Sequence, residues 1–216
     1  MRVAIFSAGG LAKVVCESLR LQNQHRIVGF FDDVKKGRFC GCPILGKCSQ
    51  FRSLSKKLKI KGLFVAFGYH FLDKRLSYCK EIAREKELDF VNAVHPAATI
   101  SSDAEIGKGV YIGPGVIVNP GTKIGDNSII WSGTIIEHDN NIGKNVFISP
   151  GVRTAGYTEI GDNSFIGMGA DITKAKIGRN VTVGTASLVL NNVKSNKYIL
   201  GMPARIIKTK KKLSYV

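Results

Sequence analysis

The sequence predicts two domains of different architecture: a Rossmann-like α/β domain with a parallel sheet over residues 1–94, and a parallel β-helix over residues 95–207. The first prediction rests on a strand, a glycine turn, a helix, a strand and an acidic pair, which is the order of a mononucleotide-binding unit. The second rests on aliphatic residues that recur at every sixth position. The remaining residues, 208–216, form a basic C-terminal tail.

The β-helix is predicted from a strict repeat. Glycine directly follows an aliphatic residue every eighteen positions, at residues 107, 125, 143 and 161. A period of six nested in a period of eighteen indicates three short strands per coil, and hence a triangular prism with one aliphatic side chain per face pointing inward. The repeat is expected to end at Asn191, with a loop and a final strand over residues 198–205. The inward positions are Val94, Ile100, Ile106, Ile112, Val118, Ile124, Ile130, Ile136, Ile142, Ile148, Ile160, Ile166 and Ile172, with Thr154 as the one exception, and then Ile177, Val183 and Val189 after the loss of one residue.

In the first domain the sequence predicts strands at residues 2–6, 27–31, 62–68 and 88–94, and helices at residues 11–19, 49–58 and 69–86. Residues 37–46 are expected to form a loop. Ligands of such sheets lie at the carboxyl ends of the strands, which here are Ser7–Leu11, Asp32–Asp33 and Gly68–Tyr69. The turn departs from the G-x-G-x-x-G pattern, because Ser7, Gly9 and Ala12 hold its key positions. A tight turn without a ligand therefore stays open as an alternative.

The composition, 44% hydrophobic and 22% charged, is that of a soluble globular protein. No apolar run approaches the roughly 18 residues that a membrane span needs, and the N-terminus reads as a first strand and not as a signal peptide. We therefore expect a cytoplasmic protein without membrane insertion.

The formal net charge of +16 favours an anionic partner, which could be a nucleic acid, an anionic membrane surface or a phosphate-bearing small molecule. No RNA-binding, helix-turn-helix or zinc-finger signature accompanies the charge. Phosphate-bearing small substrates therefore fit at least as well as a polymer, and we expect no nucleic-acid partner.

All five cysteines lie within the first 79 residues, and an odd count argues against a disulfide framework. Cys40, Cys42 and Cys48 could belong to a zinc site, but the sequence offers no clear fourth ligand and the spacing differs from that of a zinc ribbon. We expect no metal.

The only acid–His–acid cluster in the sequence, Glu137-His138-Asp139, lies inside the repeat. His138 comes two residues after the inward Ile136, so its side chain should face outward or lie near a corner. A neighbouring carboxylate can fix the tautomer of an imidazole and stabilise the imidazolium, which is what a general base needs. A surface histidine among solvated acids is the alternative for this cluster taken alone.

Seven motifs follow one another along the chain, in the order S-A-G-G-L-A-K-V-V, F-F-D-D, V-A-F-G-Y, V-H-P-A-A-T-I-S, I-I-E-H-D-N-N-I-G, P-G-V-R-T-A-G and G-M-P-A-R. Together they resemble the sialic acid O-acetyltransferase (NeuD-like) family of sugar acyltransferases, and most closely the PglD-type nucleotide-amino-sugar N-acetyltransferases. The resemblance covers about residues 2–207.

The resemblance implies a left-handed β-helix, a homotrimer with active sites between subunits, and acetyl-CoA as the co-substrate. It makes His138 the base, oriented by Asp139 or Glu137, and makes the backbone N–H of Gly156 the oxyanion donor. The implied acetyl-CoA contacts are Phe147, Ala155, Gly156, Met168 and Gly184. The implied nucleotide-sugar contacts are Gly9, Gly10, Leu11, Asp32, Asp33, Gly68, Tyr69 and Arg75.

The function so implied is acetyl transfer to the 4-amino group of a UDP-, dTDP- or GDP-linked 4-amino-4,6-dideoxy sugar, for surface glycan or glycoprotein biosynthesis. Acetylation of a sialic-type nonulosonic acid on oxygen is the alternative within the same fold. A non-catalytic scaffold built from hexapeptide repeats is an alternative of another class, because a fold alone does not define a function.

Overall fold

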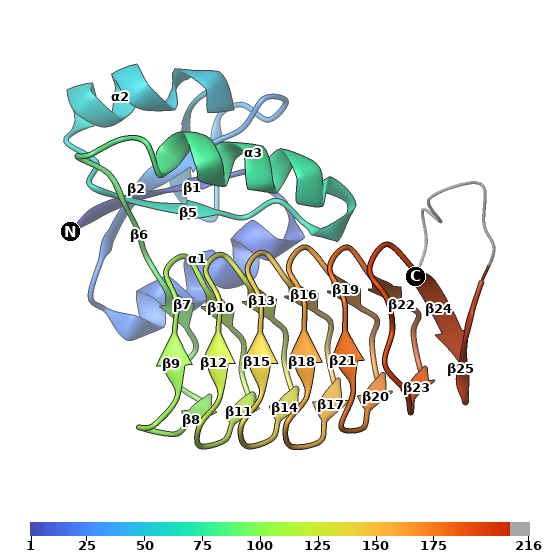
Figure 1. The fold of residues 1–216 in the computed structure, drawn as a ribbon. Coiled ribbons are helices and arrows are strands. Elements are labelled where there is room, and N and C mark those ends of the chain that lie inside the picture. The colour runs from blue at the N-terminus through green and yellow to red at the C-terminus, as the bar shows by residue number, and fades with distance from the viewer. Residues whose placement is uncertain (208–216) are drawn as a thin grey trace. The chain divides into compact units, whose positions relative to one another are not determined.

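The computed structural model describes residues 1–207, and the predicted basic tail lies outside the described residues. The chain divides into two compact units, Met1–Pro96 and a second unit that begins at Ala97. None of the described helices combines the length and apolar character that a bilayer span requires. Figure 1 shows the order of the elements along the chain.

The first unit contains a six-stranded sheet in the order β3-β4-β2-β1-β5-β6, parallel except for the β3–β4 pair. Its strands are β1 (Arg2–Phe6), β2 (Arg26–Phe31), β3 (Arg38–Phe39), β4 (Cys42–Gly46), β5 (Gly62–Val65) and β6 (Asp89–Phe90), and β7 (Ala93–Val94) ends the unit. The helices are α1 (Gly10–Gln22), α2 (Phe51–Leu58) and α3 (Leu72–Ile82), with 3₁₀ turns η1 (Cys48–Gln50) and η2 (Tyr69–Phe71).

The pattern of buried apolar residues accounts for the strands and helices of this unit. Residues 3–6 of β1 are fully buried, as expected for a central parallel strand that is covered on both faces. On α1, Leu11, Val15 and Leu19 recur every four residues and are buried, so they form the single apolar stripe of a surface helix. The core is aromatic: Phe6 contacts Phe31 at a ring-centroid distance of 5.3 Å. The predicted α/β architecture is confirmed.

Two local predictions in this unit were wrong. Residues 37–46 form the hairpin β3–β4 and not a loop. Its turn, Cys40–Gly41, has φ values of 47° and 72°, and positive φ at both central residues is the conformation that joins tight hairpins. Cysteine is not among the residues that signal such a turn. The predicted strand over residues 88–94 is divided into β6 and β7.

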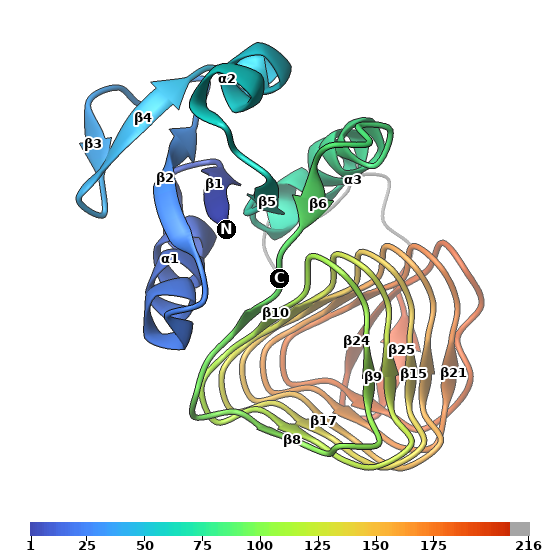
Figure 2. The ribbon, with the colours of Figure 1, turned by 90° about the vertical axis from the view of Figure 1, so that its left-hand side faces the viewer.

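The second unit is a left-handed parallel β-helix of three sheets, and Figure 2 shows its triangular coils end-on. One sheet contains β8 (Thr99–Ile100), β11 (Ile117–Val118), β14 (Ile135–Ile136), β17 (Arg153–Thr154), β20 (Asp171–Ile172) and β23 (Leu188–Val189). The next contains β9 (Glu105–Ile106), β12 (Lys123–Ile124), β15 (Asn141–Ile142), β18 (Glu159–Ile160) and β21 (Lys176–Ile177). The third contains β10 (Tyr111–Ile112), β13 (Ile129–Ile130), β16 (Phe147–Ile148), β19 (Phe165–Ile166), β22 (Thr182–Val183), β24 (Tyr198–Gly201) and the antiparallel β25 (Ala204–Ile206).

Each coil buries a second residue per face, which the sequence analysis missed. This residue lies two positions before the inward aliphatic residue and is small. Several of these residues carry a hydroxyl that donates to a carbonyl of the next coil: Thr122 Oγ1 to Glu137 O at 2.9 Å and Ser128 Oγ to Gly143 O at 2.9 Å. These bonds let a buried polar side chain connect successive coils without an unsatisfied donor. The set comprises Val110, Val116, Thr122, Ser128, Thr134, Asn140, Val146, Val152, Thr158, Ser164, Ala170, Ala175, Val181 and Ser187.

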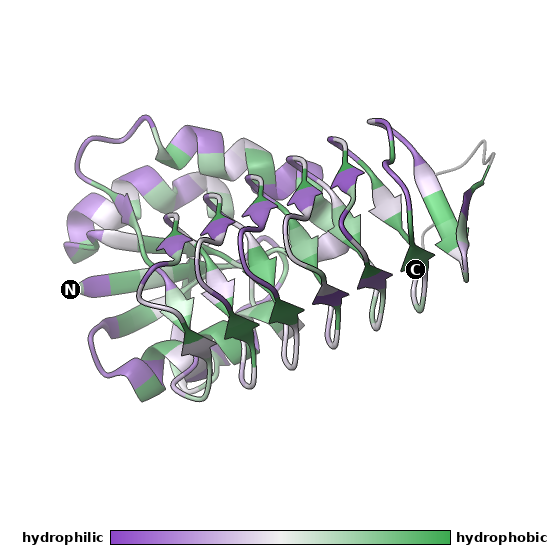
Figure 3. Ribbon diagram, turned by 60° about the horizontal axis from the view of Figure 1, so that its bottom comes forward, coloured by the Kyte–Doolittle hydropathy of each residue, from purple (hydrophilic) through white to green (hydrophobic). Residues whose placement is uncertain are grey.

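The outer faces differ in polarity, as Figure 3 shows. The β9–β21 sheet presents charged residues in ion pairs, such as Lys123 with Glu105 at 2.7 Å. The β8–β23 sheet presents the apolar Ile117 and Ile135 on neighbouring strands. Ile117 is exposed and Ile135 is half-buried, and an aliphatic strip of this kind is typical of surfaces that associate.

The six-residue spacing is lost after Asn191 and a strand follows at residue 198, as predicted, but the β-helix does not end there. Val193 forms a parallel bridge with Ile177, and Ile199 on β24 pairs in parallel with Val183. The coil therefore continues to Ile199. In this last coil each residue pairs with the one sixteen positions earlier, and sixteen is not a multiple of six. A search for the six-residue repeat therefore does not find it.

Candidate active site

The acid–His–acid cluster lies at the corner between β14 and β15. Ile136 points into the β-helix, as predicted, and His138 projects outward with half of its side chain exposed. Asp139 makes the turn with a φ of 55°, a left-handed conformation that aspartate tolerates better than most residues. Gly121 and Tyr157 hold the same left-handed position one coil earlier and one coil later, with φ values of 71° and 59°.

The imidazole of His138 is held by Asp139. Nδ1 of His138 lies 2.8 Å from Oδ2 of Asp139. An ionised carboxylate only accepts hydrogen bonds, so Nδ1 carries the proton in this pair and Nε2 of a neutral ring is left as the proton acceptor. Among the described residues Glu137 has no side-chain ion pair; its backbone oxygen instead accepts from Thr122 and Asn140. Asp139 therefore holds the orienting position that the sequence left open between the two acids.

Gly156 lies in the next coil, against the imidazole ring. A Cβ built on Gly156 would lie 2.6 Å from both Cε1 and Nε2 of His138, which is too close for any side chain. Nothing among residues 1–207 accepts a hydrogen bond from the backbone N–H of Gly156. An unpaired N–H beside the accepting nitrogen of a base suits an oxyanion formed next to that base.

Two further neighbours define this corner. Tyr157 contacts His138 edge-on at a centroid distance of 5.2 Å, and the ammonium of Lys174 lies 5.0 Å from the Tyr157 ring centroid. The one exception to the aliphatic repeat, Thr154, lies beneath the site, where its hydroxyl accepts the N–H of Glu137 at 3.3 Å.

The residues expected to contact acetyl-CoA do not converge within one chain. Ala155 and Gly156 share the corner of His138, whereas Met168 and Gly184 lie at the other end of the β8–β23 sheet, on the corner that follows the β10–β24 sheet. Phe147 is buried on β16, with its ring stacked on Phe165 at 5.7 Å. Within one chain, the expected acetyl-CoA contacts therefore lie on two different corners of the β-helix.

A Cβ on Gly184 would meet the side chain of Leu200, which is partly exposed and would have to move aside. Met168, by contrast, is 55% exposed and available to a ligand.

In the first unit, the expected ligand-binding residues follow three adjacent strands, β2, β1 and β5. Gly9 caps α1 without a side-chain hydrogen bond, so the first N–H groups of this helix have no side-chain acceptor from the cap and suit an anion. A Cβ on Gly10 or Gly68 would meet nothing within 4 Å, so both glycines border open space. Tyr69 directly follows Gly68, and its ring is tilted against that of His70 at a centroid distance of 3.9 Å.

The side chain of Asp32 accepts hydrogen bonds from the loops that follow β1 and β2. Its Oδ2 accepts the N–H of Ala8 at 2.7 Å, and its Oδ1 accepts the N–H groups of Val34 and Lys35 at 2.9 and 2.7 Å. Burial alone would raise the pKa of Asp32, but these N–H donors outweigh it and hold the pKa below its usual range. The carboxylate therefore joins the ends of β1 and β2.

Asp33 is also engaged. Its Oδ2 lies 2.8 Å from Nζ of Lys74, and its Oδ1 accepts the N–H of Cys48 at 2.9 Å. The hydrogen bond from Lys74 lowers the pKa of Asp33.

We expect Asp32→Asn to destabilise the protein by about 1.5–3 kcal/mol at pH 7, because a charged acceptor of three backbone N–H groups is lost. The folded-state pKa is lowered, so the contribution of Asp32 is complete above the unfolded value of about 3.9 and is lost as the pH falls through the folded value. Urea unfolding at pH 7 and pH 3 measures this. Equal stability of both proteins at pH 7, or a difference that is no smaller at pH 3 than at pH 7, would contradict the assignment.

Two expected substrate contacts are buried and cannot offer their side chains to a ligand at the surface. Leu11 is 5% exposed and belongs to the core stripe of α1. Arg75 has no exposed surface, its Nε donates to Val65 O at 3.0 Å, and burial lowers the pKa of Arg75 to about 10. Arg75 supports the end of β5 from inside. Sequence spacing placed it near the strand ends but did not show which side of α3 it occupies.

The cysteines considered for zinc do not come together. Cys48 is buried, with its Sγ 3.4 Å from Phe31 O, whereas Cys42 Sγ lies 3.5 Å from Nη2 of Arg20. Across residues 1–207, no three His, Cys, Asp or Glu side chains are placed to hold a metal ion.

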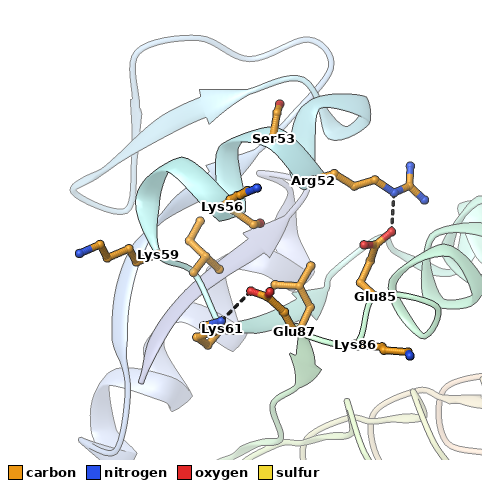
Figure 4. Close-up of a pocket in the computed structure, with 11 residues that line it drawn as sticks. Arg52, Ser53, Lys56, Lys59, Lys61, Glu85, Lys86 and Glu87 are labelled. Carbon is orange, nitrogen blue, oxygen red and sulfur yellow. Dashed lines mark hydrogen bonds and ion pairs between the residues drawn. The ribbon is translucent and has the colours of Figure 1, made fainter.

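A pocket of about 630 Å³ lies at the amino ends of β5 and β6, opposite the carboxyl ends where the expected ligand-binding residues lie (Figure 4). Its walls carry more basic than acidic residues, and two ion pairs cross it: Arg52 with Glu85 at 2.6 Å and Lys61 with Glu87 at 2.9 Å. Ligands of parallel sheets do not bind at this end of the strands, so we assign this pocket no part in the site.

Comparison with known proteins agrees with this description. Residues 2–77 match the PglD N-terminal domain family. Residues 103–138 match the bacterial transferase hexapeptide family (six repeats), and residues 133–174 and 157–185 match the hexapeptide repeat of succinyl-transferase. A comparison with curated protein sequences gave no significant match.

Solved structures match over nearly the whole chain. PerB from Caulobacter crescentus, in complex with CoA and GDP-perosamine, is 30% identical over 96% of this chain and 98% of that chain, with a TM-score of 0.88. The acetyltransferase domain of PglB from Neisseria gonorrhoeae is 26% identical over 95% of this chain and 99% of that chain, with a TM-score of 0.89. WeeI from Acinetobacter baumannii is 25% identical over 96% and 100% of the two chains, with a TM-score of 0.79.

The left-handed β-helix and the match to the hexapeptide transferase family define a hexapeptide-repeat acyltransferase. The chain belongs more narrowly to the PglD-type family of acetyltransferases, because the N-terminal domain and a full-length match at 30% identity accompany the repeat. The predicted family is confirmed.

Proposed function

We propose that the protein is an acetyl-CoA-dependent N-acetyltransferase that acts on the 4-amino group of a nucleotide-linked 4-amino-4,6-dideoxy sugar. The observation that carries this proposal is the corner at β14 and β17, where Nε2 of His138 faces Gly156 while Asp139 holds Nδ1. The relatives support the two substrates: PerB was solved with CoA and GDP-perosamine, and the PglB domain was solved in complex with acetyl coenzyme A.

The reaction is direct transfer. Nε2 of His138 accepts the proton of the sugar amine as the amine nitrogen bonds to the thioester carbonyl carbon. The carbonyl oxygen, which gains negative charge, accepts a hydrogen bond from the N–H of Gly156. When the C–S bond breaks, the sulfur of CoA leaves and takes the proton from Nε2 of His138, which restores the neutral imidazole. None of the described side chains in contact with His138 is a serine or cysteine, so the geometry favours a single transfer without an acyl-enzyme.

The first unit supplies the nucleotide-sugar site. The uncapped N–H groups at Gly9, Gly10 and Leu11 suit a diphosphate, and Gly68 and Tyr69 border the same edge of the sheet. Asp32 and Asp33 shape the loop between them. In this proposal, Leu11 contributes its backbone only, and Arg75 supports the end of β5.

The active enzyme is a homotrimer with sites between subunits. The separation of Ala155 from Met168 and Gly184 on two corners supports this assembly, as does the aliphatic strip at Ile117 and Ile135. Nucleotide sugars and acetyl-CoA are both made in the cytoplasm, so we place the reaction there.

The test is the release of CoA, followed with a thiol reagent, in the presence of UDP-, dTDP- and GDP-linked 4-amino-4,6-dideoxy sugars. We expect saturable turnover with one of these nucleotides and none with the matched 4-hydroxy sugar, because a hydroxyl is a far weaker nucleophile near neutral pH. Faster turnover with a sialic-type nonulosonic acid would replace the proposal with O-acetylation. No turnover and no CoA binding would indicate a scaffold.

A further inference from the structure

One buried polar side chain lies directly beneath the proposed base. Asn140 is 1% exposed and occupies the second inward position of the coil that carries His138. In the coils before and after, Thr122 and Thr158 hold the equivalent position, so a hydroxyl is enough to connect successive coils at this corner.

The amide of Asn140 joins the two coils that form the site. Its Nδ2 lies 2.7 Å from Glu137 O, 3.1 Å from His138 O and 3.0 Å from Ala155 O. The first two carbonyls belong to the turn that presents the base, and the third immediately precedes Gly156. Rotating the amide would direct Oδ1 at three carbonyl oxygens, so the network itself requires Nδ2 to be the atom in this position.

Thr158 shows what a threonine achieves at this position. Its Oγ1 donates to Ala155 O at 2.9 Å and to Thr173 O at 3.3 Å, which correspond to the contacts of Asn140 with Glu137 O and Ala155 O. The contact that only the amide adds is the one to the carbonyl of the histidine itself.

The amide of Asn140 also buries a carbonyl oxygen, at a cost in stability that stacking of the coils does not require. Oδ1 of Asn140 is buried without a hydrogen-bond partner among the described residues. Unsatisfied buried acceptors are rare in native proteins and call for a reason beyond packing. That reason is available here, because the same side chain fixes both halves of the proposed catalytic pair.

We propose that Asn140 is a positioning residue that sets the distance between the imidazole of His138 and the N–H of Gly156; this inference rests on the proposed function. Asn140 touches neither substrate. It acts by holding the carbonyls of His138 and Ala155 on a single nitrogen, so that the base and the oxyanion donor cannot move apart. Small displacements of such pairs are costly, because about 1 Å of misplacement can lower a rate by about 100-fold.

Asn140→Thr tests this inference, because threonine is native to the same position at Thr122 and Thr158 and therefore suits the fold. We expect kcat to fall by about 10- to 100-fold, with both KM values changed less than about twofold and the melting curve close to that of the wild type. Ser128→Ala is the matched control: it removes an equally buried hydroxyl bond, to Gly143 O, at a different corner, and should leave kcat unchanged.

The effect should depend on the base. In a His138→Ala background, Asn140→Thr should lower the residual rate less than twofold, because there is no imidazole left to position. If the threonine variant does not fold, Asn140→Ser carries the same expectations. A folded Asn140 variant with wild-type kcat overturns the inference, as does an equal loss with and without His138. A wild-type enzyme that is inactive on every sugar, or that does not need His138, overturns the proposed function instead.

Discussion

Replacing His138 with alanine is expected to lower kcat by about 10²- to 10⁴-fold, the range typical of a lost general base. The fold should survive, because half of the side chain is exposed and the adjacent Ile136 fills the core. Asp139→Asn should give a smaller loss, because the imidazole stays but its Nδ1 no longer faces a carboxylate. The measurement is CoA release at saturating concentrations of both substrates, together with a melting curve.

The matched control for this prediction is Glu159→Gln. It changes the charge of another exposed β-helix residue, one that pairs with Lys176, and should keep wild-type turnover. A His138→Ala variant that retains more than about a tenth of kcat would remove His138 as the base, since a lost general base costs at least about 100-fold.

Replacing Gly156 with alanine is expected to lower kcat nearly as much as His138→Ala does, for a steric reason. The new Cβ would lie 2.6 Å from Cε1 and Nε2 of His138, so the ring must move away from its position. The backbone at Gly156 does not have the positive φ that excludes other residues, so the coil itself accommodates alanine. We expect kcat to fall about 100-fold with little change in melting temperature.

A double variant separates this steric effect from a general disturbance of the coil. With alanine at position 138 there is no ring for the new methyl group to displace, so Gly156→Ala should then lower the residual rate only slightly. A full loss in both backgrounds would show that Gly156 acts through something other than the imidazole.

The β-helix was predictable because its order is local. Each coil contacts only its neighbours, so a period of eighteen residues in the sequence becomes a spacing of one coil in the structure. The outward direction of His138 followed from its position after Ile136. The place of Gly156 beside it follows from the same spacing, since the two residues are eighteen apart, but the sequence does not reveal how closely the ring approaches that glycine.

Other features depend on side-chain packing that no period encodes. Thr154 appeared only as an interruption of the repeat, yet its hydroxyl accepts the N–H of Glu137 at the site. The sequence repeat marks Ile142 as inward but does not show that Asn140, two positions earlier, is also buried. The resemblance implied Arg75 as a nucleotide-sugar contact, but the side chain is buried and its Nε donates to Val65 O, ten residues earlier in β5.

The central claim is transfer of an acetyl group to a sugar amine with His138 as the base, and the most direct measurement is the position of the acetyl group in the product. The protein is incubated with ¹³C-acetyl-CoA and the nucleotide-linked 4-amino sugar that releases CoA, and the product is examined by NMR and mass spectrometry. We expect one labelled acetyl group in an amide at the 4-amino nitrogen, and a yield that falls with His138→Ala as kcat does. A labelled ester on a sugar oxygen, or an undiminished yield of amide from the His138→Ala protein, would contradict the account.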